Sequence, residues 1–144
     1  MSVKQISVFL ENRPGTLNEM TKVLADNKID MRALSVSETK DFGIARVIVD
    51  DVIRAVNVLK KEGYVASLTT VLAYAVPDEP GGLNTLLSVF AEENINLEYM
   101  YAILGGKSSE HAYMIFNVAD TVKAEAAMRG RGYTSVSQED ISVI

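Results

Sequence analysis

The sequence predicts an α+β protein that contains two copies of a β-α-β-β-α-β unit, and three observations support this prediction. The chain has 144 residues, a length that suits one domain or two small ones. The sequence of its first half is similar to the sequence of its second half when the two are aligned. In each half, segments of alternating apolar residues, which favour strands, surround segments with apolar residues at helical spacing.

The internal repeat is found at a shift of 66 positions, which aligns residues 12–31 with residues 78–97. Most apolar positions in this window have an apolar counterpart, as Leu24 has in Phe90. Seven of the twenty pairs are identical: Pro14/Pro80, Gly15/Gly81, Leu17/Leu83, Asn18/Asn84, Val23/Val89, Ala25/Ala91 and Ile29/Ile95. We infer a tandem duplication and place the two domains at residues 1–70 and 71–144.

The first copy begins with a strand in which Ile6, Val8 and Leu10 alternate with other residues. After the turn that follows it, apolar residues recur at helical spacing from Leu17 to about Asn27. The remaining predicted elements are a strand at 30–38, a hairpin turn at 39–43, a strand at 44–49, a helix from Asp50 or Asp51 to Gly63, and a strand at 64–70.

The second copy repeats this order, beginning with a strand that contains Leu72, Tyr74 and Val76. Its remaining predicted elements are a helix from Leu83, a strand at 96–104, a turn at 105–109, a strand at 112–118, a helix from Thr121 to about Arg131, and a strand at 133–144. The order corresponds to the ferredoxin-like arrangement, a four-stranded antiparallel sheet with both helices on one face. Because no linker separates the copies, we expect them to share buried surface.

Composition narrows the classes of function. The chain has 14 Lys plus Arg against 19 Asp plus Glu, a net charge of -5, which argues against a nucleic-acid or membrane-surface partner. It has no Cys, which excludes thiolate chemistry, and one histidine, His111, which is too few for a multi-histidine metal site. No apolar stretch is long enough for a signal sequence or a membrane span, so a cytoplasmic protein without a cofactor is expected.

The main candidate for a binding site is the Pro-Gly turn after the first strand of each copy. Proline presets the backbone for helix entry, and glycine lets a ligand approach the backbone. Free N–H groups at the helix N-terminus attract a carboxylate, while Asn12 or Asp78 can bind an ammonium group, so the turn suits an amino acid. The residues also fit a simple turn and helix start, but their recurrence in both copies favours the binding interpretation.

With a Pro-Gly turn after the first strand and an apolar residue two positions beyond the glycine, each copy resembles an ACT domain. The chain as a whole resembles tandem ACT domains, small regulatory modules that bind amino acids, over residues 3–70 and 71–144. The resemblance implies that the two sheets merge side by side. It also implies a homodimer, and ligands held between the turn of one unit and the second strand of the other.

The resemblance therefore implies two ligand sites. One would combine Asn12, Pro14, Gly15, Thr16 and Leu17 with Glu98, Tyr99 and Met100, and the other Asp78, Gly81, Gly82 and Leu83 with Arg32, Leu34 and Ser35. Gly82 replaces Thr16 and Asp78 replaces Asn12, so the two sites need not hold the same ligand. Residues 98–101 suit a ligand wall and equally suit a strand with one core face and one solvent face.

Other motifs point to simpler structures. Gly106-Lys107-Ser108 resembles the end of a phosphate-binding loop, but the earlier glycine is missing and a strand follows, so we interpret it as a hairpin turn. Residues 40–47 are similar to the signature of RNA-recognition modules, but Phe42 is their only aromatic residue. Adjacent carboxylates such as Asp50-Asp51 do not face each other and suit helix caps.

We therefore expect a non-catalytic, amino-acid-binding regulatory or sensor protein, since the chain offers no nucleophile–base pair or metal cluster. Its expected partners are a free amino acid, a metabolic enzyme and a second copy of the chain. The alternative is a structural or interaction module that docks a partner enzyme without binding a ligand. Only the first hypothesis predicts that replacing Gly15 and Gly81 by Val changes function.

Overall fold

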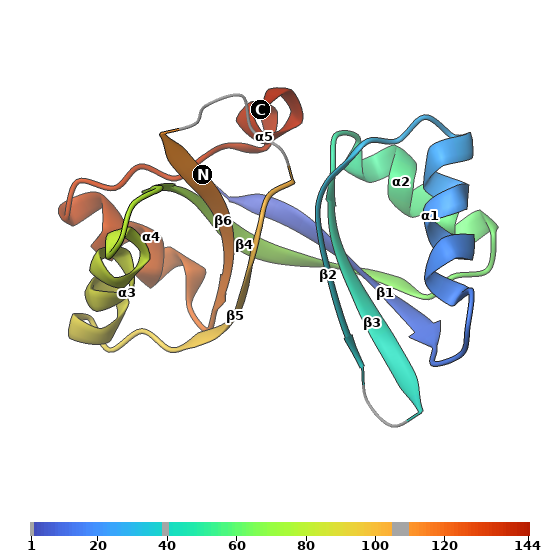
Figure 1. The fold of residues 1–144 in the computed structure, drawn as a ribbon, viewed down its shortest axis with the longest axis horizontal. Coiled ribbons are helices and arrows are strands. Elements are labelled where there is room, and N and C mark those ends of the chain that lie inside the picture. Colours follow the sequence, from blue (N-terminus) through green and yellow to red (C-terminus); the bar gives the residue numbers. More distant parts are fainter. Residues whose placement is uncertain (1, 39–40, 105–109) are drawn as a thin grey trace. The chain divides into compact units, whose positions relative to one another are not determined.

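The computed structural model describes residues 2–38, 41–104 and 110–144. Its contacts divide the chain into two compact units. The N-terminal unit is Lys4–Thr69, and the C-terminal unit consists of Met1–Val3 together with Thr70–Ile144. Each unit combines a sheet with helices, which confirms the predicted α+β class (Figure 1).

The N-terminal unit follows the predicted order of elements. They are β1 (Val3–Glu11), α1 (Thr16–Asp26), β2 (Met31–Glu38), β3 (Phe42–Val49), α2 (Val52–Lys61) and the start of β4 (Ala66–Pro77). Strand β3 lies antiparallel between β1 and β2. On the other side of β1, the Phe9 N–H donates to the Val65 carbonyl at 3.0 Å. Helices α1 and α2 cover one face of this sheet (Figure 1).

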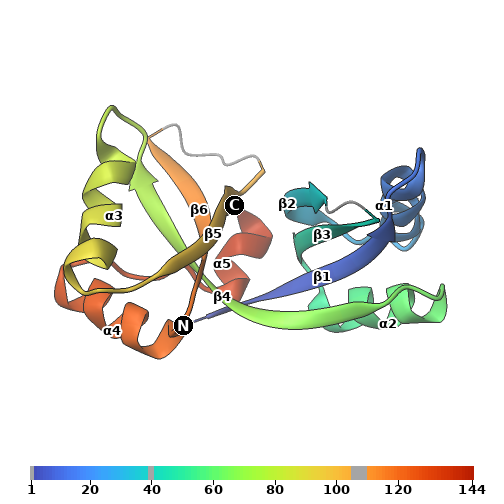
Figure 2. The same ribbon diagram turned by 90° about the horizontal axis from the view of Figure 1, so that it is seen from below.

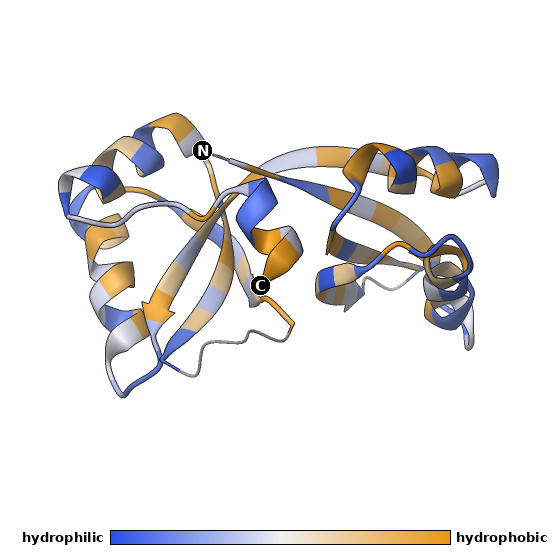
Figure 3. Ribbon diagram, turned by 90° about the horizontal axis from the view of Figure 1, so that it is seen from above, coloured by the Kyte–Doolittle hydropathy of each residue, from blue (hydrophilic) through white to orange (hydrophobic). Residues whose placement is uncertain are grey.

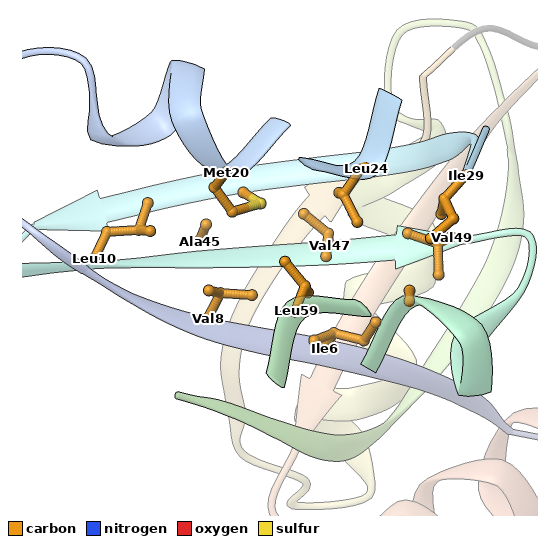
Figure 4. Close-up of a cluster of buried hydrophobic side chains, with 11 residues drawn as sticks. Ile6, Val8, Leu10, Met20, Leu24, Ile29, Ala45, Val47, Val49 and Leu59 are labelled. Carbon is orange, nitrogen blue, oxygen red and sulfur yellow. The ribbon is translucent and has the colours of Figure 1, made fainter. Parts of the chain in front are cut away.

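The core of the N-terminal unit lies between its sheet and its two helices (Figure 4). Strand β1 contributes every second residue, as the alternating pattern predicts, and the helices contribute residues one turn apart. The buried residues drawn there include Ile6, Val8 and Leu10 of β1, Met20 and Leu24 of α1, Ala45, Val47 and Val49 of β3, and Leu59 of α2. Burial of this apolar surface is the main favourable term in folding the unit.

The C-terminal unit repeats the order of the first five elements and ends differently. Its elements are the rest of β4, α3 (Gly82–Glu92), β5 (Leu97–Ala102), β6 (His111–Val118), α4 (Thr121–Gly130) and α5 (Gln138–Val143). Strand β6 lies antiparallel between β4 and β5, and α3 and α4 cover one face of the sheet (Figure 1). Figure 3 shows apolar and polar residues mixed along these helices, as expected when one side of each faces a core. The pair of ferredoxin-like units predicted from the repeat is thereby confirmed.

The strand predicted at residues 133–144 is wrong. Residues 133–137 are irregular, with the Val136 N–H donating to the Ala73 carbonyl at 2.7 Å, and α5 follows. The reason is a capping box, in which the Ser137 hydroxyl accepts from the Asp140 N–H at 3.1 Å and the Asp140 carboxylate accepts from the Ser137 N–H. Helix α5 lies across the sheet from α3 and α4 (Figure 2), and its Ile141 is fully buried.

The two strands predicted at residues 64–70 and around residues 72–76 are one continuous strand, β4. No Pro, Gly or turn residue interrupts residues 66–76, so nothing in the sequence ends the first strand before the second begins. The contact division passes through this strand between Thr69 and Thr70, and Met1–Val3, which includes the first residue of β1, belongs to the C-terminal unit. The domain boundary at 70/71 and the side-by-side merging of the sheets stay predictions.

Two further predictions concern the hairpin turns and membrane spans. Two stretches of the predicted hairpin turns lie outside the described residues: residues 39–40, and residues 105–109, which include the motif similar to a phosphate-binding loop. Within the described ranges, every helix is too short or too polar to cross a membrane.

Candidate functional site

The first Pro-Gly turn is an exposed, tightly hydrogen-bonded corner between β1 and α1. Gly15 has φ +88° and ψ -9°, a left-handed conformation that glycine adopts without strain, and its carbonyl accepts from the Glu19 N–H at 2.9 Å. The Thr16 hydroxyl donates to the carbonyls of Glu11 at 3.0 Å and Arg13 at 3.2 Å. A Cβ on Gly15 would meet no atom within 4 Å, so the space beside the turn is open.

Charges surround the first turn. Arg13 Nε lies 2.9 Å from Glu11 Oε2, and Arg13 Nη2 lies 3.6 Å from Glu19 Oε2. The hydrogen bond to Glu11, followed by the charge of Glu19, raises the pKa of Arg13. Both pairs are largely exposed, so they orient the loop more than they stabilise the fold.

The second turn, between β4 and α3, repeats this geometry. Gly81 has φ +85° and ψ -7°, and its carbonyl accepts from the Thr85 N–H and the Thr85 hydroxyl, each at 3.0 Å. The Asp78 N–H donates to the Glu110 carbonyl at 3.0 Å, which holds the turn to the start of β6. A Cβ on Gly81 would again meet nothing within 4 Å.

The replacement of Thr16 by Gly82 has a steric reason. Glu11 and Pro77 are equivalent residues, because both are matched by the 66-residue shift. In the first turn, the Thr16 hydroxyl donates to the Glu11 carbonyl. In the second, the Gly82 backbone lies so close to the Pro77 carbonyl that a Cβ would be 2.2 Å from its oxygen. The second turn is therefore closed by backbone contact, and the first by a side-chain hydroxyl.

The helices that follow the turns begin without a side-chain cap. Gly15 and Gly81 are the N-cap residues of α1 and α3, and neither helix has a side-chain hydrogen bond at its N-cap. By contrast, the Asp51 carboxylate accepts from the Arg54 N–H at 3.2 Å in α2, and Asp120 accepts from the Lys123 N–H at 3.0 Å in α4. First-turn N–H groups that have no intrahelical partner form a small site of positive potential.

One second-strand residue of each predicted site, Arg32 or Glu98, lies at a β-bulge, and the two bulges occupy equivalent positions that were not predicted from the sequence. Met31 pairs with Val49 but Ala33 pairs with Ile48, so Arg32 is the extra residue in β2. The register of β5 against β6 shifts in the same way between Leu97 and Tyr99, at Glu98. A bulge redirects its side chain. Arg32 Nη1 lies 3.0 Å from Asp30 Oδ2, and Glu98 Oε2 accepts from Asn117 Nδ2 at 3.0 Å.

The other predicted strand residues fall on different faces. Leu34 and Met100, equivalent residues of β2 and β5, pack against the cores of their own units. Ser35 is half-buried on β2. The Tyr99 ring stacks on that of Tyr101, with centroids 6.4 Å apart and planes 18° apart. Residues 98–101 therefore form a strand that packs Met100 against the core and also buries Tyr101, which fits the core interpretation at these two residues and leaves Tyr99 beside the bulge.

Each unit contains its own turn residues and its own second-strand residues. Asn12, Pro14, Gly15, Thr16 and Leu17 lie in the N-terminal unit together with Arg32, Leu34 and Ser35. The C-terminal unit contains Asp78, Gly81, Gly82 and Leu83 together with Glu98, Tyr99 and Met100. Each predicted site combines residues of both units, so its assembly stays a prediction. Asn117, which the analysis missed, could have been noticed as a polar residue in the apolar run at 112–118.

Metal chemistry has no candidate among the residues that the structure describes, which contain no group of three or more Asp, Glu, His or Cys side chains placed to hold an ion. The features at the turns are hydrogen-bond donors and acceptors of backbone and side chains. Groups of this kind can bind and orient a polar ligand.

Comparison with protein families identifies the fold. Residues 1–144 match a family described as the ACT domain pair. The chain belongs to this family. The Pro-Gly turns, and the helices α1 and α3 that lack a side-chain cap, therefore occur in an ACT domain pair, as the sequence predicts.

Solved structures similar to this ACT pair agree with this assignment. Protein BT0572 from Bacteroides thetaiotaomicron is 31% identical with a TM-score of 0.92, and the match covers 100% of this chain and 98% of that one. The regulatory subunit of aspartate kinase from Thermus thermophilus, in a ligand-free form, is 18% identical with a TM-score of 0.64 over 90% of each chain. The corresponding Thermus flavus subunit is 18% identical with a TM-score of 0.60 over 88% of each chain. No curated protein matches the sequence.

Proposed function

We propose that this ACT pair binds a free amino acid at its Pro-Gly turns and acts as a non-catalytic regulatory or sensor protein. The observation that carries the proposal is the contrast between helix ends. α2 and α4 are capped by Asp51 and Asp120, whereas α1 and α3 begin behind a left-handed glycine with no side-chain cap. The same contrast occurs in both copies, and an added ligand carboxylate would supply the missing acceptor.

The ligand's ammonium group needs an acceptor on the other side of the site. In the first proposed site this is Glu98, with the amide oxygen of Asn12. In the second it is the Asp78 carboxylate. The bulged residues Glu98 and Arg32 have opposite charges at equivalent positions, so the two sites would differ in the ligand side chain that they accept: Arg32 favours an acidic one.

Ligand binding would regulate by differential affinity for two states of the protein. We propose a metabolic enzyme as the regulated partner, a homodimer as the assembly and the cytoplasm as the location. The Thermus neighbours are regulatory subunits of an enzyme, aspartate kinase. The competing hypothesis, a module that docks a partner without a ligand, predicts a complex that is indifferent to free amino acids.

The test is a thermal-denaturation screen of ligand-free protein against each free amino acid. A ligand present at 100 times its Kd should raise the free energy of unfolding by about 2.7 kcal/mol. The expected result is a saturable increase in melting temperature with one amino acid or a few related ones. Absence of a shift with every amino acid would contradict the proposal and favour the docking module.

A matched set of variants distinguishes ligand binding from general stability. Gly63 has φ +88°, a left-handed conformation like that of Gly15 and Gly81, and an added Cβ there would also meet no atom within 4 Å. It follows the C-terminal end of α2 and belongs to neither Pro-Gly turn. Gly→Val at any of the three positions should cost about 1–2 kcal/mol of stability through left-handed strain. Only Gly15→Val and Gly81→Val should weaken the ligand-induced shift. Equal ligand shifts in all three variants would contradict a site at the turns.

A further inference from the structure

The C-terminal unit has a groove between α3 and the residues that follow α4. The two helices lie side by side on the sheet (Figure 1), and the groove has a volume of about 370 Å³. This volume is within the range of about 300–1,000 Å³ that is usual for small-molecule sites. Thr85, Ser88, Val89 and Glu92 of α3 line one side of the groove, and Arg131 and Tyr133 line the other.

The first copy has a lysine where this groove has a serine. The shift of 66 aligns Lys22 with Ser88 and Asp26 with Glu92. In α1, Lys22 Nζ donates to Asp26 Oδ2 at 2.6 Å, so an alkyl chain with an ammonium end runs along the helix from one residue to the other. In α3 the carboxylate is retained, but Ser88 has no chain that could reach it. The second copy therefore keeps the acceptor and lacks the alkylammonium group.

The hydroxyl groups that line the groove act as acceptors toward a ligand. The Thr85 hydroxyl donates its proton to the Gly81 carbonyl at 3.0 Å, and the Ser88 hydroxyl donates its proton to the Asn84 carbonyl at 2.8 Å. A hydroxyl has one proton and two acceptor lone pairs, so in this arrangement neither hydroxyl has a proton left for an anion. The two hydroxyls therefore favour a ligand that donates hydrogen bonds.

The charges beside the groove favour a cation. Arg131 Nη1 lies 2.6 Å from Glu92 Oε2, and Arg131 Nη2 lies 3.3 Å from Glu93 Oε1. Two carboxylates share one guanidinium, so the three groups together have a net charge of -1. They also lie at the C-terminal end of α3, the negative end of the helix dipole, and the last turn of α3 has no basic residue. A carboxylate offers about four acceptor positions, so Glu92 can accept from an ammonium group in addition to Arg131.

The groove also offers apolar surface to an alkyl chain. Val89 is buried in the C-terminal core, and Tyr133 packs against the same core. Both residues recur in the first copy, as Val23 and Tyr64, and each tyrosine follows the left-handed glycine after the second helix of its unit. A tyrosine ring provides contact area for methylene groups, and its face attracts a cation.

We propose that this groove binds a small aliphatic ammonium ion, a ligand with the shape and charge of a lysine side chain. The ammonium group donates to Glu92, and the alkyl chain lies against Val89 and Tyr133 toward Ser88, along the course that Lys22 takes in α1. A groove of this volume suits a free amine, whereas a partner protein typically buries about 800 Å² on each side of its interface. The ligand needs no carboxylate, so this site is distinct from the amino-acid site proposed at the Pro-Gly turns.

The experiment is a titration of the full chain with n-butylammonium chloride, followed through the amide resonances of Ser88 and Glu92. This probe has the alkyl chain and the charge of a lysine side chain, and it has no carboxylate to place at the Pro-Gly turns. It should give saturable shifts at both amides, whereas sodium butyrate and sodium chloride at the same concentrations should not. A short peptide with one lysine between glycines should bind no more tightly than butylammonium. Binding of this peptide at least tenfold more tightly would overturn the assignment to a free amine in favour of a lysine of a partner protein.

Three variants locate the binding. Ser88→Lys restores the residue of the first copy and should abolish binding of butylammonium, because its own ammonium group can reach Glu92. Glu92→Gln should weaken binding at least threefold. Glu93→Gln is the matched control, since it removes the other carboxylate beside Arg131 but Glu93 does not line the groove. It should weaken binding less than Glu92→Gln does.

Two further results would overturn the proposal. One is a titration without saturable shifts at Ser88 and Glu92, or with equal shifts for butyrate. The other is a folded Ser88→Lys protein that binds butylammonium as tightly as the wild type does. The outcome is separate from that of the amino-acid screen: a protein that binds butylammonium at these amides and binds no free amino acid would support this groove and contradict the site at the turns.

Discussion

Gly82 and Thr16 occupy equivalent positions, yet only glycine fits the second turn. Gly82→Ala would place a methyl group 2.2 Å from the Pro77 carbonyl oxygen. We expect a loss of about 1–3 kcal/mol in the free energy of unfolding, because a backbone atom cannot move aside cheaply. Urea denaturation measures this loss. Gly130→Ala is the control, since a Cβ there meets nothing within 4 Å, and a similar loss in both variants would contradict the steric explanation.

Tyr74 gives the protein a specific sensitivity to alkaline pH. Burial raises the pKa of its phenol in the folded state above the ordinary value of 10.0. The folded state therefore holds the phenol proton more tightly, so this contribution to stability is complete below pH 10 and decreases as pH rises beyond it. The wild type should lose up to about 1.4 kcal/mol per pH unit more than Tyr74→Phe above pH 10. Parallel urea titrations at pH 8 to 11 check this, and identical slopes would contradict it.

At the scale of elements, the helices differ in how their ends are satisfied. α2 and α4 begin with an Asp cap and α5 with a complete capping box, while α1 and α3 begin with glycine. Caps made by the chain itself make a helix end independent of other molecules. The N-terminal ends of α1 and α3, where we propose that a ligand binds, are therefore the two that have no side-chain acceptor at the N-cap.

Helix α5 depends on its cap because it has only six residues. Isolated helices of this length are unstable, so the capping box and the burial of Ile141 must hold it in place. Ser137→Ala should cost about 1 kcal/mol in urea denaturation and should increase hydrogen exchange in α5 before the rest of the unit. Ser142→Ala, which removes an exposed hydroxyl of the same helix, serves as the control. Unchanged exchange in α5 would show that Ile141 alone anchors it.

At the scale of the whole chain, the two units are linked through β4 and β1. β4 runs from one unit into the other, and the first residues of the chain belong to the C-terminal unit. Each unit is small enough to be marginal alone. We therefore expect Leu59→Ala, which creates a cavity in the N-terminal core, to cost about 2–5 kcal/mol.

Because a strand is shared, that variant should increase hydrogen exchange in both units together. Leu86→Ala in the C-terminal core is the reciprocal variant and should have the same effect. If each substitution increased exchange only in its own unit, the units would fold independently, and the continuity of β4 would carry no cooperativity.

Much of this organisation follows from the sequence alone. The repeat at 66, the alternation of Ile6, Val8 and Leu10, and the recurring Pro-Gly turn determined the duplicated fold and the place of the turns, because local periodicity and turn chemistry depend on neighbouring residues. Only the tertiary structure showed the continuous β4, the bulges at Arg32 and Glu98, and the close approach of Gly82 to Pro77. It also showed α5 and the buried hydroxyl of Tyr74, which has no hydrogen-bond partner among the described residues. Those features depend on contacts between residues far apart in the chain, which no local pattern specifies.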